Sequence, residues 1–207
     1  MLILASASPR RREILSSLGI RFEVVVPDVK EVREGDPEQV VLENARRKAR
    51  FGLTAWREAG VPGRGTDLAL GVDTEVVLDG RVLGKADDAE GARSRLQALA
   101  GRTHSVLSAV VLIGSAEREE RSGVARSEVT FRELDGATLE MYLRSGEWRD
   151  RAGAYAIQGL GSVLVERVEG DFSNVVGQPV RLLLDLAPEL FDQAGGSPGE
   201  ATVFPDP

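Results

Sequence analysis

The pattern of apolar and polar positions divides the chain into short strands and amphipathic helices. Residues 1–5, MLILA, are apolar throughout, which is typical of a buried strand. Residues 9–18 carry apolar side chains three and four positions apart, so they predict a helix, which Gly19 ends. The run RFEVVVP, residues 21–27, predicts a second strand. Strand and helix therefore alternate from the start of the chain.

The next helix opens with the sequence DPEQ. Asp36 is predicted to cap it, Pro37 takes the first helical position, and Gln39 completes a capping-box pattern. The helix continues through residues 40–53, VVLENARRKARFGL, and gives way to the loop GVPGRG at residues 60–65.

The clearest hairpin signal lies in residues 68–85, LALGVDTEVVLDGRVLGK. Its turn is the Asp-Gly pair at residues 79–80, a pair that favours two-residue hairpin turns. Continued pairing from that turn places Thr74 opposite Lys85. Asp73 then lies one step from Lys85 across the hairpin.

The rest of the chain predicts three more helices and three more strands. The helices cover residues 87–101, 135–146 and 179–191, and the strands cover residues 104–115, 125–134 and 162–170. Asp87 or Asp88 caps the first of these helices, and the last is broken near Pro188. Residues 116–123 form a charged turn, and residues 192–207 lack periodicity and are predicted to be a disordered tail. This irregular alternation, with a hairpin, predicts an α/β protein with a mixed sheet.

Composition describes an ordinary globular protein of 207 residues, 42% hydrophobic and 29% charged. No run approaches the ~18 apolar residues of a membrane span, and no basic segment precedes the apolar start as in a signal peptide. The absence of cysteine excludes disulfides, thiolate metal sites and cysteine nucleophiles, and fits a cytoplasmic location. The net charge of −7 argues against a broad nucleic-acid-binding surface but leaves room for a local basic pocket.

Three consecutive arginines stand in the first turn of the first helix. Ser8 is the predicted N-cap, so Arg10, Arg11 and Arg12 lie at the positive end of the helix dipole, where each exposed cation is disfavoured by ~0.3–1 kcal/mol. They form either a solvated face or an anion site with the free N–H groups of the helix, to which Ser6 and Ser8 could add hydroxyl donors.

A carboxylate and two lysines form a second candidate group. Asp73 lies inside an apolar strand and needs a partner or a metal. Beside Lys85 it suits a metal–triphosphate site, although a structural ion pair is the alternative. Lys48 shares a helical face with Val41 and Ala45, so it either extends past that face to solvent or points into a site.

Residues 144–161, RSGEWRDRAGAYAIQGLG, form a loop rich in small and aromatic residues. Its Gln158 offers an amide donor and acceptor that match the O4 and N3–H groups of uracil or thymine. The alternative is a tight turn with aromatic packing. Glu31 by itself is loop charge. His104, the only histidine, is interpreted as structural because no second histidine or cysteine could join it in a metal site.

Taken together, these segments resemble the Maf family over about residues 2–180. The motifs that carry the resemblance are, in order, LASASPRR, ENARRKA, GVDTEVVLDGRVLGK, LAGRTHSV, VTFREL, GEWRDRAGAYAIQGLG and GDFSNVVGQP. The Ala-Gly-Ala-Tyr-x-Ile-Gln-Gly stretch is similar to that of the branch that hydrolyses dTTP and UTP. Ala86, Ala156 and Gln178 depart from the residues usual in that branch, but none replaces a charged catalytic group.

The resemblance implies a nucleoside triphosphate pyrophosphatase that releases a nucleoside monophosphate and pyrophosphate with a divalent metal, Mg or Mn. It implies one domain over residues 1–191, with an elongated α/β mixed-sheet fold like that of inosine triphosphatase and a central cleft between two lobes. The expected role is house-cleaning of canonical or modified pyrimidine nucleotides, and a homodimer is compatible with the resemblance. The alternative is a nucleotide-binding regulator of septum formation with little turnover.

The resemblance also assigns roles to individual residues. The expected catalytic residues are Asp73, Lys48 and Lys85, and the expected metal ligands are Asp73 and Glu31. Asp73 either activates the attacking water or helps Glu31 to hold the metal. The expected substrate-binding residues are Ser6, Ser8, Arg10, Arg11, Thr74 and Gln158, of which Arg10, Thr74 and Gln158 are linked to base choice.

Overall fold

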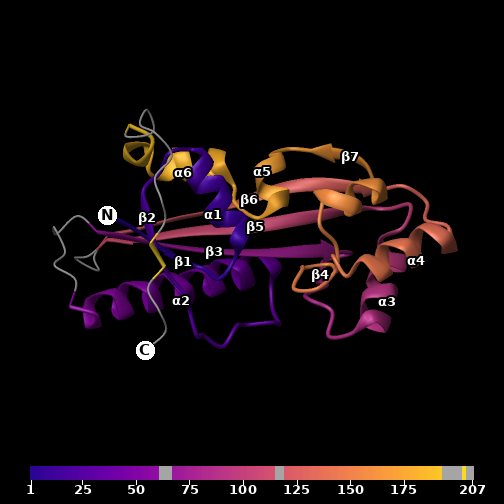
Figure 1. The fold of residues 1–207 in the computed structure, drawn as a ribbon, viewed down its shortest axis with the longest axis horizontal. Coiled ribbons are helices and arrows are strands. Elements are labelled where there is room, and N and C mark those ends of the chain that lie inside the picture. The colour runs from indigo at the N-terminus through magenta and orange to yellow at the C-terminus, as the bar shows by residue number, and fades with distance from the viewer. Residues whose placement is uncertain (61–66, 115–118, 193–201, 204–207) are drawn as a thin grey trace.

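The computed structural model describes residues 1–60, 67–114, 119–192 and 202–203, which form an elongated α/β fold around one sheet (Figure 1). The strands are β1 (Leu2–Ala5), β2 (Phe22–Val25), β3 (Leu68–Leu78), β4 (Arg81–Val82), β5 (Thr103–Gly114), β6 (Glu120–Phe131), β7 (Val165–Glu169) and β8 (Thr202–Val203). The helices are α1 (Pro9–Ser17), α2 (Pro37–Glu58), α3 (Ala89–Leu99), α4 (Gly136–Ser145), α5 (Phe172–Val176) and α6 (Val180–Leu186), with 3₁₀ helices η1 (Gly159–Leu164) and η2 (Pro188–Leu190).

The sheet is mixed, as predicted. Its described strands run in the order β7-β6-β5-β3-β1-β2-β8, and β4 pairs separately with β3. β1 is parallel to both of its neighbours, whereas the pairs from β3 through β5 and β6 to β7 are antiparallel. The parallel strands need crossover helices, which α1 and α2 supply, and the antiparallel strands need only short turns.

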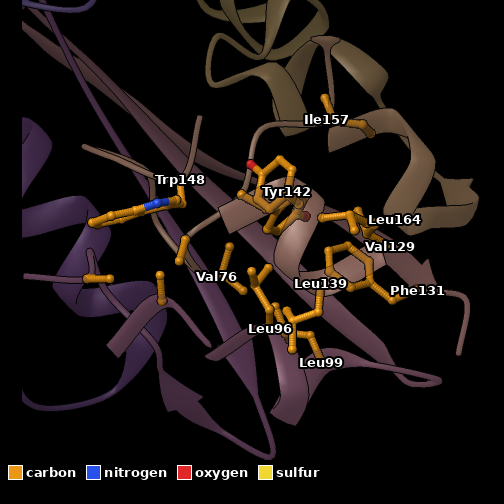
Figure 2. Close-up of a cluster of buried hydrophobic side chains, with 14 of the residues drawn as sticks. Val76, Leu96, Leu99, Val129, Phe131, Leu139, Tyr142, Trp148, Ile157 and Leu164 are labelled. Carbon is orange, nitrogen blue, oxygen red and sulfur yellow. The ribbon is translucent and has the colours of Figure 1, made fainter. Parts of the chain in front are cut away.

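Helices cover both faces of the sheet at its β1 end. α2 packs on one face and α1 and α6 on the other (Figure 1). Alternate residues of β5 explain why both faces are apolar, since Leu107 and Ala109 face α2 while Val110 and Leu112 face α1 and α6. At the far end, α3, α4 and η1 enclose a separate core around Phe131, and Figure 2 shows Val129, Leu139 and Leu164 beside its ring. The fold therefore has two lobes that share the long strands.

Helix α2 approaches β3 unusually closely at Gly71. A Cβ atom at this position would collide with the carbonyl oxygen of Ala45 and the amide nitrogen of Ala49. Glycine is therefore required there, because only the absence of a side chain lets the two backbones meet. The close approach brings the polar side chains of α2 down to the level of the strand.

Strand β3 lacks a strand neighbour along part of one edge. Residues 68–71 pair with β1 and residues 77–78 with β4 on this edge, while β5 pairs with residues 68–77 on the other. None of the described strands pairs with residues 72–75 on the first edge. The gap lies between the two lobes and is the point at which the sheet can open to a ligand.

Helix boundaries follow the predicted capping signals. The Asp36 carboxylate accepts the N–H of Gln39 at 3.1 Å and begins α2, and Asp88 caps α3. α2 continues to Glu58, beyond the predicted stretch, and α6 ends before Pro188, where the helix was predicted to break.

The predicted hairpin forms at the expected turn but ends earlier than predicted. β4 is only Arg81–Val82, because Gly84 takes the left-handed conformation at φ +57° and turns the chain away from β3. Thr74 consequently does not face Lys85, and pairs instead with Ser108 of β5. The predicted cross-strand pairing of the two was wrong.

Two predictions in the C-terminal third also need correction. The strand predicted over residues 162–170 begins only with β7, because η1 precedes it: the Glu147 carboxylate accepts the N–H groups of Leu160 and Gly161 and turns that segment into a 3₁₀ helix. The short helix α5, which Asp171 caps, was not predicted from the hydrophobic pattern.

Two further predicted segments, the turn and the tail, lie partly outside the described residues, and the part that is described differs from the prediction. β6 begins at Glu120, inside the predicted turn 116–123, part of which lies outside the described residues. The predicted tail 192–207 also lies largely outside them, apart from β8, which runs parallel to β2. Across the described ranges, no helix combines the length and the apolar character that crossing a membrane requires.

Candidate active site

A cavity of about 400 Å³ opens at the gap beside β3 and is lined by both lobes. The polar side chains that line it are Ser8, Arg10, Arg11, Glu31, Lys48, Asp73, Thr74, Glu75, Lys85, Glu147, Asp150, Arg151, Tyr155 and Gln158. An adjoining cavity of about 630 Å³ shares Arg10, Lys85 and Arg151 with it, and extends along the turn before α1.

A lysine joins two carboxylates at the centre of the first cavity. Lys48 Nζ lies 2.6 Å from Glu31 Oε1 and 2.6 Å from Asp73 Oδ1. Burial raises the pKa of Glu31, but the charge and hydrogen bond of Lys48 outweigh it and hold that pKa below its ordinary value. Of the two interpretations of Lys48, the structure therefore shows the one in which its ammonium group points into a site.

Asn44 fixes the orientation of Asp73. Its side-chain amide donates to Asp73 Oδ2 at 3.1 Å and to the carbonyl oxygen of Val32 at 3.0 Å, and it accepts the N–H of Val32 at 2.7 Å. Asn44 is 1% exposed and Asp73 5%, so these bonds are shielded from water. Asn44 thereby joins the loop that carries Glu31 to helix α2 and to β3.

Glu75 lies two residues from Asp73 on the same face of β3 and also lines the cavity. Burial raises the pKa of this carboxyl to about 8, and the negative charges of Asp73 and Glu31 act in the same direction. Its Oε2 is buried without a hydrogen-bond partner. A carboxyl group in this state indicates that the cavity has capacity for additional positive charge.

The carboxylates of Glu31 and Asp73 are suitable ligands for a hard divalent cation that binds few protein groups. Among the residues that the structure describes, no three acidic or imidazole groups are close enough to enclose a metal ion. Mg²⁺ is commonly held by one or two carboxylates together with substrate phosphates and water. Glu31 and Asp73 supply such a pair, because the same lysine contacts an oxygen of each.

The N-terminus of α1 is left open to an anion. Ser8 is the N-cap, as predicted, but its side chain makes no capping hydrogen bond, and the first turn holds no acidic residue. Its backbone N–H donates instead to Ser6 Oγ at 3.1 Å. Arg10 Nη1 is buried without a hydrogen-bond partner. Free N–H groups and a free guanidinium at one helix start are the elements of a phosphate site.

Arg11, by contrast, is held by the protein. It donates from Nε to the carbonyl oxygen of Gly177 at 2.8 Å, from Nη1 to Ser6 Oγ at 3.1 Å and from Nη2 to Thr74 Oγ1 at 3.2 Å. Burial lowers its pKa, opposed by the charges of nearby carboxylates. Thr74 Oγ1 also shares a hydrogen bond of 2.8 Å with Ser108. Arg11 therefore connects α1 to β3 and to the segment after α5.

Lys85 reaches the cavity by a route different from the predicted hairpin. Its backbone pairs with Ala152 in an isolated bridge, and Gly153 donates its N–H to the carbonyl oxygen of Gly84 at 2.9 Å. These contacts place Lys85 in the wall of both cavities, and its side chain forms no ion pair with any described residue.

The far end of the first cavity is formed by the loop that carries Gln158. Gln158 is exposed and lines the cavity, as does Glu147, whose carboxylate holds the start of η1. Behind the loop, the Tyr142 hydroxyl accepts the N–H of Ala156 at 3.0 Å. The loop is therefore supported from beneath by the far lobe.

His104 supports the same loop from the far core. Its Nε2 lies 2.8 Å from the Tyr155 hydroxyl, and its ring meets those of Phe131 and Tyr155 edge to face. The residue is buried away from the cavity lining, in agreement with its interpretation as structural.

This geometry can be compared with that of known proteins. A family model described as "Maf-like protein" matches residues 1–190. The chain belongs to the Maf family.

Relatives in this Maf family share nearly the full length of the chain. A protein from Deinococcus radiodurans named "dTTP/UTP pyrophosphatase" is 46% identical over 186 residues, which cover 89% of this chain and 90% of the relative. Proteins of the same name from Anaeromyxobacter dehalogenans and Thermococcus gammatolerans are 48% and 45% identical, over 86% and 90% of this chain and 88% and 95% of theirs. A crystal structure titled nucleoside-triphosphatase / dITP/XTP pyrophosphatase, from Mycobacterium abscessus, matches at 23% identity with a TM-score of 0.40, over 64% of this chain and 74% of that one.

The residues that the sequence and the Maf resemblance predict for the site line the first cavity, except Ser6, which lines the adjoining one, and Arg12, which lines neither. Asn44, Glu75, Glu147 and Arg151 were not predicted. The sequence could have identified Asn44. It lies four residues before Lys48 on the inward face of the helix, where a buried amide needs a hydrogen-bond partner. Glu75 alternates with Asp73 on β3, which places both on one face.

Proposed function

We propose that this chain is a nucleoside triphosphate pyrophosphatase that hydrolyses dTTP and UTP to the nucleoside monophosphate and pyrophosphate. The observation that carries the proposal is the arrangement along one cavity. A carboxylate held by Lys48 and Asn44 lies between an open helix N-terminus and a loop that carries Gln158. The name shared by the relatives, dTTP/UTP pyrophosphatase, supports the same reaction.

The basic side chains of the cavity bind the triphosphate. Arg10 has an unpartnered buried nitrogen, and the helix N-terminus beside it offers free N–H groups. Guanidinium groups and helix N-termini are strong phosphate ligands because both present several N–H donors to the anion. Ser6 and Arg11 shape this end through their hydrogen bonds, and Lys85 adds a charge from the opposite wall.

Asp73 accepts a proton from the attacking water in the proposed reaction. The water oxygen forms a bond to the α-phosphorus, the bond from that phosphorus to the bridging oxygen breaks, and pyrophosphate leaves with the electron pair. Lys48 holds Asp73 in place through its hydrogen bond to Oδ1, and the basic side chains stabilise the charge that develops on the phosphates. Catalysis is then positioning and electrostatics, with no covalent intermediate.

Glu31 and Asp73 would hold the divalent metal. When bound, Mg²⁺ or Mn²⁺ would neutralise phosphate charge beside the scissile bond. The two carboxylates already have a cation between them in Lys48, so the site tolerates positive charge at this point. The partnerless Oε2 of Glu75 adds an oxygen that the same charge would stabilise.

Gln158 reads the base in this proposal. Its amide can donate to O4 and accept from N3–H, which uracil and thymine both present. The loop is fixed from behind by Tyr142 and from the side by Glu147, so the amide lies on a supported segment. Selectivity for dTTP and UTP would follow from this contact, and the proposed role of the reaction is house-cleaning of canonical or modified pyrimidine nucleotides.

A competition among nucleotides tests the reaction and the base together. The protein is incubated with Mg²⁺ and an equal mixture of the common ribo- and deoxynucleoside triphosphates, and the products are resolved chromatographically. The proposal expects UMP, TMP and pyrophosphate to form first. Release of inorganic phosphate, or equal consumption of all bases, would contradict it.

A variant separates the enzyme from a nucleotide-binding regulator of septum formation, the alternative from the sequence. Asp73→Asn keeps the size and the bond to Lys48 but removes the proton acceptor, so turnover should fall at least about 10²-fold, as is typical for loss of a general base. Binding of UTP should persist. If the unmodified protein binds UTP but leaves it intact in a single-turnover assay with Mg²⁺, the regulator is favoured.

A further inference from the structure

Arg151 is a cation in the cavity wall to which the proposed mechanism assigns no role of its own. It lines both cavities, yet it forms no ion pair or hydrogen bond through its side chain with any residue the structure describes. Its Nε is buried without a partner, so part of the guanidinium is removed from water. A half-buried arginine without an acceptor is costly to the free protein, and such groups are usually matched by a ligand.

The backbone around Arg151 is firmly held. Ala152 pairs with Lys85, and Gly153 donates to the carbonyl oxygen of Gly84. A Cβ atom at Gly153 would lie 2.8 Å from a methyl carbon of Val76, so the loop is packed directly on β3. Arg151 is thus presented from a rigid segment of the far lobe.

Neighbouring charges do not neutralise Arg151. Burial lowers its pKa, and no nearby carboxylate counteracts that effect. Asp150 also lines both cavities, but it is exposed and makes no ion pair with Arg151 in the described chain. The Arg149 guanidinium carbon lies 4.7 Å from the centre of the Trp148 ring, over its face, and Arg149 lines only the adjoining cavity. The guanidinium remains charged, because arginine does not lose its proton in proteins.

The position of Arg151 indicates which part of a nucleotide it would meet. The adjoining cavity contains the α1 turn but no residue of the loop 155–159, which forms the base end of the first cavity. Arg151 and Arg10 line the part common to both, one from each lobe. Glu31, Lys48 and Lys85 also line this part, so the common part is the phosphate end, from the α1 turn to the carboxylate–lysine group.

We propose that Arg151 binds the pyrophosphate portion of the substrate and of the released product, opposite Arg10. This inference rests on the proposed function, since it assigns a leaving-group ligand to that reaction. Two guanidinium groups on separate lobes bind two phosphate groups in a bidentate manner and stabilise the charge that the leaving pyrophosphate acquires.

Equilibrium titration with inorganic pyrophosphate, and separately with UMP, tests the proposal at a fixed Mg²⁺ concentration. Arg151→Met keeps the length and apolar stem of the side chain. It should weaken pyrophosphate binding about tenfold or more, as loss of charge-assisted hydrogen bonds predicts, and change UMP binding less than twofold. The pyrophosphate affinity of Arg151→Lys should lie between that of the unmodified protein and that of Arg151→Met. Arg144→Met, an exposed arginine of α4 outside both cavities, should leave both affinities unchanged.

The ratio of the two affinities separates a specific contact from a general structural effect. An unchanged pyrophosphate affinity in Arg151→Met, or an equal loss for pyrophosphate and UMP, would overturn the proposal. If Arg151→Met unfolds, the same two affinities are measured for Arg151→Lys. A ratio of pyrophosphate to UMP affinity equal to that of the unmodified protein would then also overturn the proposal. The two proposals fail separately: a protein that cleaves UTP but binds pyrophosphate without Arg151 loses only this inference, whereas one that leaves UTP intact loses the proposed function.

Discussion

Arg10 and Arg11 are adjacent in sequence and differ completely in their surroundings. Arg11 donates to three protein acceptors and connects α1, β3 and the segment after α5. Arg10 has a buried nitrogen with no acceptor and faces the cavity. Both occupy the first turn of a helix without an acidic residue. The unfavourable interaction of their charges with the helix dipole is offset in one case by protein oxygens and in the other, we infer, by phosphate.

His104 allows a clean test at the scale of one residue because it is the only histidine in the chain. It is 2% exposed, and burial lowers its pKa to about 4, although the charge of Glu128 opposes the shift. Between pH 4 and the ordinary value of about 6.5, the unfolded chain binds a proton that the folded chain excludes. The free energy of unfolding should therefore be highest above pH 6.5 and fall by roughly 3 kcal/mol towards pH 4 from this residue alone.

The single imidazole makes the measurement direct. Its C–H proton resonance should keep the shift of the neutral ring from pH 8 down to pH 5 in the folded protein. In denaturant titrations, His104→Gln should lose less stability than the unmodified protein between pH 6.5 and pH 4.5. A folded-state titration midpoint near pH 6.5 would show that the ring is accessible to water and that the prediction is wrong.

At the scale of elements, the site depends on where strands stop. β1 ends at Ala5, opposite Gly71, and β4 ends at Val82, opposite Val77, so β3 has an unpaired edge between the two. An acidic residue in the middle of a paired strand would be enclosed by neighbours, whereas Asp73 faces an open cavity from a rigid strand. The rigidity comes from β5, which pairs along the entire opposite edge.

Two loop glycines provide a matched test of how the Arg151 segment is held. Gly84 and Gly153 have φ angles of +57° and +65°, but an added Cβ meets nothing within 4 Å at Gly84 and lies 2.8 Å from Val76 at Gly153. Gly84→Ala should destabilise the fold by about 1–2 kcal/mol through the backbone alone. Gly153→Ala should cost a further ~1–3 kcal/mol through overpacking.

Urea unfolding of the two alanine variants supplies the comparison. Because Gly153→Ala also pushes the segment off β3, it should weaken pyrophosphate binding, in addition to lowering the unfolding midpoint. Equal midpoints for the two variants would mean that the segment is not packed on Val76 in solution.

At the scale of the whole molecule, the long strands join the two lobes (Figure 1). Each lobe has its own core, and residues of both lobes line the cavity. A ligand that contacts both lobes binds only the folded protein, in which the two lobes face each other across the cavity, and therefore stabilises that state. A UTP analogue with a methylene group between the α- and β-phosphorus atoms, at 100 times its Kd, should add about 2.7 kcal/mol. For a chain of this size that corresponds to a rise in Tm of roughly 5–10 °C.

Differential scanning calorimetry in the presence of Mg²⁺ measures this shift. One cooperative transition should move as a unit, and the adenine counterpart of the analogue at the same concentration should move it less. Two transitions, of which the ligand moves only one, would show that the lobes unfold independently and that the ligand contacts one of them.

Much of the architecture could be predicted because local signals determine it. Capping carboxylates such as Asp36 and Asp88 mark helix starts, and apolar alternation marks β5. The errors occurred where a single residue, distant or local, overrides the periodic pattern. Glu147 turns the start of a predicted strand into a 3₁₀ helix, and Gly84 ends the hairpin before it reaches Lys85. Neither effect has a periodic signal in the sequence near the affected residues.

The sequence by itself determined the α/β class, the positions of most helices and strands, and the types of side chain that could handle phosphate. Those properties follow from short-range periodicity and from the chemistry of single residues. Only the tertiary structure decided which of those side chains act together. Asn44 meets Asp73 across 29 positions, and Arg11 meets Gly177 across 166, because α2 and α1 pack on opposite faces of one sheet. Contacts of this kind depend on long-range packing, which spacing along the chain does not encode.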